Sequence, residues 1–119
     1  EIWCTDFFEL RREDIPRIDA VYDRAALIAL PPEMRTVYSD HLAGLVRGGV
    51  PVLMITLDYP KEEMKGPPFS VTRSEVEGLF SGSFSIQFLK ADERLSEEPR
   101  FRKKGLTRMD EHVYLMRKI

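Results

Sequence analysis

The run from Val50 to Leu57 constrains the fold more than any other stretch, because it is apolar at almost every position. A strand with one face in water alternates apolar and polar residues, and this run does not. It therefore predicts a strand covered on both faces, as in the middle of a parallel sheet. A helix is predicted before it, between Pro31-Pro32 and Gly48-Gly49, and another after it, opening on a capping box at Thr72 to Glu75.

Four further strands are predicted around this centre. Their ranges are Glu1 to Phe8, Ile18 to Tyr22, Phe84 to Leu89 and Val113 to Met116. The alternation of strands and helices through the middle of the chain is typical of βαβ units. The last two strands are separated by the long, charged segment Lys90 to Thr107 rather than by a full helix, which predicts an antiparallel end to the sheet.

Composition limits the classes of function. The 119 residues suffice for one domain, and the formal net charge of -2 with interspersed acids and bases argues against a general nucleic-acid binder. The single cysteine, Cys4, excludes an intrachain disulfide and a cysteine metal cluster, and it suits a reducing cytoplasm. Together with Ile2, Cys4 is predicted to face a core. No apolar run approaches the roughly 20 residues that span a bilayer, so no membrane partner is expected.

The pair Asp23-Arg24 is the first candidate for a site. It ends the strand predicted over Ile18 to Tyr22, and ligands of open α/β sheets bind at the carboxyl ends of the strands. An exposed ion pair worth under about 1 kcal/mol explains the same pattern. Asp6 has two explanations as well, a site residue or a cap of the following turn. The two histidines, His41 and His112, are expected to be structural.

Four stretches resemble the thiopurine S-methyltransferase family in its bacterial form, and the resemblance covers essentially the whole chain. They are Asp-Ala-Val-Tyr-Asp-Arg-Ala-Ala-Leu-Ile-Ala-Leu-Pro-Pro at 19–32, Gly-Pro-Pro-Phe-Ser-Val at 66–71, Trp-Cys-Thr-Asp-Phe-Phe at 3–8 and Arg-Phe-Arg-Lys-Lys-Gly-Leu-Thr-Arg at 100–108. The first two are long and specific, and with the spacing between them they are hard to obtain by chance.

The resemblance implies an α/β fold, that of the class I S-adenosylmethionine-dependent methyltransferases, with a Rossmann-like, mostly parallel sheet and an antiparallel last strand. Residues 1–119 would form the back half of that single domain, without its N-terminal cofactor-loop half. Glu1 to Cys4 would end the third strand, Ile18 to Tyr22 would be the fourth and Val50 to Leu57 the fifth. The fourth strand would then show an apolar edge, and the 119-residue chain alone should bind S-adenosylmethionine poorly.

The resemblance also implies roles for individual residues. Asp6 and Phe7 fall where the family lines the adenine pocket, and Arg24 falls near both the methyl donor and the substrate. Arg100 falls where an arginine approaches the aromatic thiol, and Gly66 to Phe69 lie at the rim of the site. Methyl transfer to sulfur needs alignment and oriented charge rather than a covalent intermediate, and an arginine favours a thiolate. No metal is expected.

Three functions follow as alternatives. The first is methylation of the sulfur of thiopurines or other aromatic or heterocyclic thiols, with S-adenosylmethionine as the cofactor and a small-molecule thiol as the partner. The second is methylation of selenium or tellurium compounds. The third is a truncated, non-catalytic methyltransferase fold that assembles with a partner along its open edge. The complete protein is expected to be a cytoplasmic monomer. For this form there are two alternatives, pairing along the open edge or a missing N-terminal segment.

Overall fold

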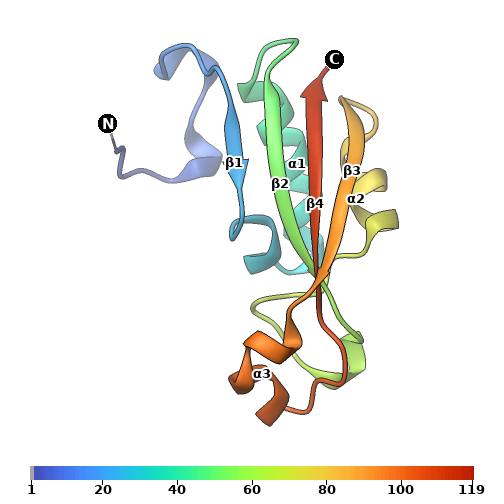
Figure 1. The fold of residues 1–119 in the computed structure, drawn as a ribbon. Helices are drawn as coiled ribbons and strands as arrows, with labels where there is room; N and C mark the ends of the chain where they lie inside the picture. Colours follow the sequence, from blue (N-terminus) through green and yellow to red (C-terminus); the bar gives the residue numbers. More distant parts are fainter. Residues whose placement is uncertain (1) are drawn as a thin grey trace.

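A computed structural model describes residues 2–119 as a four-stranded sheet in the order β1-β2-β4-β3 (Figure 1). The strands are β1 Val21–Asp23, β2 Pro51–Asp58, β3 Phe84–Glu93 and β4 Asp110–Lys118. β1 and β2 are parallel, with Val21 opposite Val52, and β4 is antiparallel to both β2 and β3. The predicted antiparallel end is confirmed, and β1 and β2 are parallel neighbours, but the other neighbour of β2 in the described sheet is the antiparallel strand β4. β1 begins three residues later than predicted, and its end includes Asp23.

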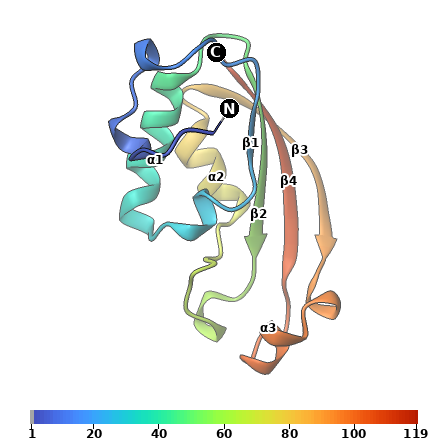
Figure 2. The same ribbon diagram turned by 90° about the vertical axis from the view of Figure 1, so that its left-hand side faces the viewer.

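Two helices cover the same face of the sheet, as Figure 2 shows. They are α1 Pro32–Leu45 and α2 Arg73–Phe80, and the short helix α3 Pro99–Lys103 lies beyond the end of the strands. Thr72 caps α2 as expected, since its hydroxyl accepts from the Glu75 amide at 3.2 Å. The reciprocal bond of the capping box is replaced, because the Glu75 carboxylate pairs with the buried guanidinium of Arg35 at 2.8 Å. No helix among residues 2–119 is long and apolar enough to cross a membrane.

The main core lies between the sheet and these two helices. As a result, only one face of β2 is fully buried. Val52 and Met54 are fully buried against the helices, whereas Leu53 between them is 36% exposed. The expectation that both faces of this strand are covered is wrong for the described residues, because α1 and α2 both lie on one face. The residues of β2 are apolar on both faces of the strand, so the sequence did not reveal which face the helices cover.

The N-terminal segment packs against α1 instead of forming a strand. Glu1 lies outside the described residues, and residues 2–6 have no regular structure. The guanidinium of Arg12 donates to the carbonyls of Gly44 and Val46 at 3.1 and 3.2 Å, satisfying acceptors at the end of α1. The predicted strand over Glu1 to Phe8 and the predicted core positions are therefore wrong, since Ile2 and Cys4 are exposed.

A second, smaller cluster anchors the segment between β3 and β4. Its members are apolar and buried, and they come from the loops after β2 and after β3: Tyr59, Met64, Leu95, Phe101, Leu106 and Met109. The predicted long, charged excursion thus folds around its own apolar residues. Short 3₁₀ turns complete the chain at Phe7–Glu9, Arg12–Asp14, Leu27–Ala29, Lys61–Glu63 and Leu95–Glu97.

The one-sided burial of β2 predicts unequal effects for two neighbouring truncations. Met54→Ala should lower the free energy of unfolding by about 3 kcal/mol, because it removes a fully buried side chain and leaves a cavity. Leu53→Ala should cost under about 1 kcal/mol, because that side chain is already partly in water. Urea unfolding followed by circular dichroism measures both, and equal costs would contradict the described packing.

Candidate active site

A cavity of about 370 Å³ lies at the carboxyl ends of β1 and β2. Arg24 follows β1 directly, and Ile55 and Leu57 of β2 form part of the wall. These two β2 residues alternate with the buried Met54 and Thr56, so the cavity lies on the face of the sheet that α1 and α2 leave uncovered. We call it the Arg24 cavity. Its position is the usual ligand-binding position of an open α/β sheet.

Two of the predicted site residues, Arg24 and Arg100, line this cavity together. Arg24 is exposed and has no hydrogen bond or ion pair with any described residue. The Nε of Arg100 is 3.5 Å from an Oε of Glu98, and its guanidinium lies over the Phe101 ring at 4.7 Å. Both arginines thus border one space, although they come from distant parts of the chain, and the charge of Arg24 is not neutralised by a described carboxylate.

Asp23, the other half of the candidate pair, has a structural role. Asp23 is 3% exposed, and its Oδ1 accepts from the amides of Ala26 and Leu27 at 3.2 and 3.3 Å. Oδ2 accepts from the hydroxyl of Tyr38 on α1 at 2.5 Å. Burial, together with the neighbouring carboxylate, raises the pKa of Tyr38 far above its ordinary value, so this hydroxyl remains the donor. Asp23 therefore does not face the cavity as a ligand group, and Arg24 forms no ion pair with it.

Arg94 is a cavity residue that the sequence did not reveal. Its guanidinium donates to Glu97 at 2.8 Å and to Glu111 at 3.2 Å, and its amide donates to the Met109 carbonyl at 2.9 Å. Hydrogen bonding to Glu97, followed by the charge of Glu111, raises the pKa of Arg94 above its usual value. These bonds tie the segment that carries Arg100 to the start of β4. The partners are spread over the chain from 94 to 111, so no local motif marks them.

Asp6 and Phe7 do not line the Arg24 cavity. Oδ1 of Asp6 accepts from the Phe8 amide at 3.0 Å, as the capping explanation predicts. The Phe7 ring is half-buried and packs on α1, with its centroid 5.4 Å from the Tyr38 ring and 4.9 Å from the His41 ring. The two predicted groups, Asp6 with Phe7 and Arg24 with Arg100, thus occupy different places in the described chain.

The segment Gly66 to Phe69, which we call the rim loop, borders the cavity through Pro68. The Phe69 amide donates to the Ile28 carbonyl at 2.7 Å, which fastens the loop to the segment that follows Arg24. A Cβ on Gly66 would lie only 2.3 Å from the Phe69 ring, so only glycine allows the loop to close on itself. Within the rim loop, Pro68 is thus the residue that borders the cavity, and the bond from Phe69 to Ile28 holds it there.

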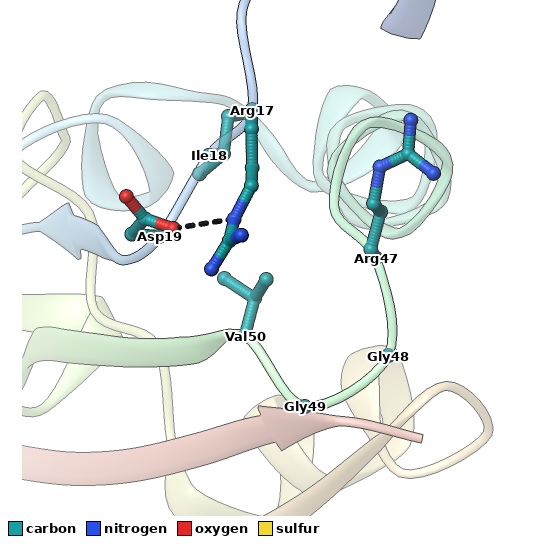
Figure 3. A pocket seen from close by; sticks show the side chains of 7 residues that line it. All are labelled: Arg17, Ile18, Asp19, Arg47, Gly48, Gly49 and Val50. Atoms are coloured by element: carbon teal, nitrogen blue, oxygen red, sulfur yellow. Dashed lines mark hydrogen bonds and ion pairs between the residues drawn. The ribbon is translucent and has the colours of Figure 1, made fainter.

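A larger cavity, about 540 Å³, lies at the opposite end of the sheet (Figure 3). Arg17 and Arg47 stand on either side of it, and Arg17 is already paired with Asp19 at 2.8 Å. It borders the amino end of β2, next to Val50, where ligands of open α/β sheets do not usually bind. Its larger volume alone therefore does not make this cavity the candidate active site. Neither His41 nor His112 lines either of these two cavities.

Comparison with known families decides the family of the chain. The sequence model described as Thiopurine S-methyltransferase (TPMT) matches residues 1–119. The chain belongs to the thiopurine S-methyltransferase family. A thiopurine S-methyltransferase of Nitrosospira multiformis is 45% identical over 113 residues, which are 95% of this chain and 51% of that protein. One of Pseudomonas fluorescens (strain SBW25) is 49% identical over 114 residues, or 96% and 52%. The chain thus spans about half the length of these relatives.

Solved structures confirm the methyltransferase fold. A Burkholderia thailandensis 1,6-didemethyltoxoflavin-N1-methyltransferase, determined with S-adenosylhomocysteine, matches with a TM-score of 0.57 at 17% identity over 96% of this chain and 48% of that one. A SAM-dependent methyltransferase of Archaeoglobus fulgidus matches with a TM-score of 0.58 at 12% identity, covering 95% and 66%. At these identities the likeness concerns the fold, which is the α/β, Rossmann-like class expected from the sequence.

Two adjacent substitutions separate the structural residue from the candidate functional one. Asp23→Ala should lower the free energy of unfolding by about 2 kcal/mol or more, because it leaves buried donors without an acceptor. Arg24→Ala should change it by less than about 0.5 kcal/mol, since this side chain is exposed and unpaired among the described residues. Urea unfolding of the 119-residue chain distinguishes them. A large loss for Arg24→Ala would show that Arg24 supports the fold.

Proposed function

We propose that the protein carrying this chain transfers the methyl group of S-adenosylmethionine to the sulfur of thiopurines or other aromatic or heterocyclic thiols. The observation that supports the proposal best is the meeting of Arg24 and Arg100 on one cavity at the carboxyl ends of β1 and β2, in a chain of the thiopurine S-methyltransferase family. Other support comes from the two relatives described above, which bear the name thiopurine S-methyltransferase and match this chain over about half of their own length.

The charge and the apolar lining of the Arg24 cavity suit an aromatic thiolate. An arginine keeps its proton, so Arg24 offers a permanent positive charge to an anionic sulfur and favours the thiolate over the thiol. The walls between the two arginines include Ile28, Leu57 and Phe101, which supply apolar contact for a flat ring. These walls favour an aromatic thiol over a selenium or tellurium oxyanion, which has no apolar surface.

The residues predicted for the adenine side fit that group chemically. Oδ2 of Asp6 has no hydrogen bond to a described residue and can accept from an exocyclic amine, and the half-buried Phe7 ring can pack on a flat base. S-adenosylmethionine, when bound, supplies an electrophilic methyl group on a sulfonium. The role of Asp6 and Phe7 is then to hold one end of the cofactor, while Arg24 orients the sulfur nucleophile. Alignment of the two reactants accounts for much of the catalysis of such a displacement.

Arginine substitutions in the protein that carries this chain test the proposal. Arg24→Ala should lower kcat/KM for a thiopurine about a hundredfold, the size of effect seen when one oriented charge stabiliser is removed. Arg100→Ala should lower it as well, whereas Arg102→Ala, an exposed arginine of α3 that does not line the cavity, should leave it unchanged. Wild-type turnover in Arg24→Ala would remove Arg24 from the site.

The same assay separates the alternatives. Methylation of tellurite but not of a thiopurine would favour the selenium and tellurium function. Absence of turnover with both, together with a homogeneous oligomer of the 119-residue chain in size-exclusion chromatography, would favour an assembly module that pairs along β1.

A further inference from the structure

The two separate groups of predicted site residues meet at one buried side chain, Tyr38 of α1. Its hydroxyl donates to Oδ2 of Asp23 at 2.5 Å, directly before Arg24 in the chain. Its ring lies 5.4 Å from the Phe7 ring, centroid to centroid. Tyr38 is 6% exposed, so both contacts are made in the interior and have little competition from water.

The hydroxyl of Tyr38 acts on the backbone that presents Arg24. With Oδ2 held by Tyr38, Oδ1 of Asp23 accepts from the amides of Ala26 and Leu27. These bonds close the turn in which Arg24 lies. Because both carboxylate oxygens are engaged and buried, the side chain of Asp23 has one satisfied orientation. Removal of the hydroxyl leaves Oδ2 without a partner among the described residues, and the turn loses part of its support.

The ring of Tyr38 contacts the other group of predicted site residues, Asp6 and Phe7, through Phe7. Phe7 lies against α1 between Tyr38 and His41, which are one turn apart on the helix. His41 fixes the backbone there, since its Nε2 is 2.7 Å from the Phe7 carbonyl oxygen. The Phe7 ring itself is contacted by the ring of Tyr38 at 5.4 Å and by the neighbouring Phe8 ring at 5.7 Å, and only the first of these contacts comes from the residue that also binds Asp23. A phenyl ring without the hydroxyl would keep this contact.

We propose that Tyr38 is a positioning residue that fixes Arg24 through its hydroxyl and Asp23, and fixes Phe7 through its ring. The roles of Arg24 and Phe7 in catalysis and cofactor binding rest on the proposed function, whereas the effect on the turn does not. The two parts of Tyr38 are separable by substitution. Tyr38→Phe removes the contact to Asp23 alone, and Tyr38→Leu removes both contacts.

Amide hydrogen exchange of the 119-residue chain tests the part that is independent of catalysis. In Tyr38→Phe, the amides of Ala26 and Leu27 should exchange about tenfold faster than in the wild type, the size expected for losing one hydrogen bond to a charged group. The matched control is Tyr114→Phe, a buried tyrosine of the same core that does not contact Asp23. Equal exchange of these two amides in both variants would overturn the proposal.

Steady-state kinetics of the protein that carries this chain test the functional part. Tyr38→Phe should lower kcat/KM for the thiol about tenfold while the KM for S-adenosylmethionine stays within about twofold, because the ring contact to Phe7 remains. Tyr38→Leu should raise the KM for S-adenosylmethionine too. Asp23→Asn is a second test of the loss of kcat/KM expected for Tyr38→Phe. An asparagine has an NH₂ group in place of Oδ2, and this group cannot accept the hydrogen bond from Tyr38.

The outcomes distinguish this inference from the proposed function. Wild-type kinetics in Tyr38→Phe, or an equal loss for thiol and cofactor, would overturn the positioning role while the wild-type enzyme remains active. A wild-type protein that methylates no thiol would overturn the proposed function, and the exchange rates of Ala26 and Leu27 would still decide whether Tyr38 fixes the turn.

Discussion

The buried carboxylate of Asp23 joins the three parts of the molecule on which the candidate site depends. A desolvated carboxylate must be fully hydrogen-bonded to be tolerated in a core. Here the partners are Tyr38 of α1 and the amides that follow β1, so the end of the strand, the turn and the helix must adopt one arrangement together. Arg24 lies in the turn that these bonds hold in place. It lines the cavity, but it makes none of these hydrogen bonds itself.

The opposite wall of the cavity depends on a different set of contacts. A small apolar cluster around Phe101 and Met109 folds the segment between β3 and β4 back toward Leu57, and Arg94 ties this segment to Glu111. Arg100 is thereby placed on the same cavity as Arg24. The site is thus assembled from two independently stabilised walls, one fixed by a buried carboxylate and one by a satellite core with an ion-pair network.

Sequence patterns predicted the parts of this fold that local physics determines. The apolar run of β2, the proline start of α1 and the cap at Thr72 each act within a few residues, and the resemblance to the family brought Arg24 and Arg100 together as candidates. The exposure of Leu53 was not predictable, because the residues on both faces of β2 are apolar and the sequence does not show which face the helices cover. The packing of the N-terminal segment depends on Arg12 reaching the end of α1, and the bond from Tyr38 assigns Asp23 to the interior; both are contacts between distant residues.

The most direct measurement is a crystal structure of the protein that carries this chain, with S-adenosylhomocysteine and an aromatic thiol bound. The thiol should lie in the Arg24 cavity with its sulfur within hydrogen-bonding distance of the Arg24 guanidinium, and Asp23 should still accept from Tyr38. A thiol bound elsewhere, or an Arg24 side chain paired with Asp23 and turned away from the ligand, would contradict the proposed role of Arg24.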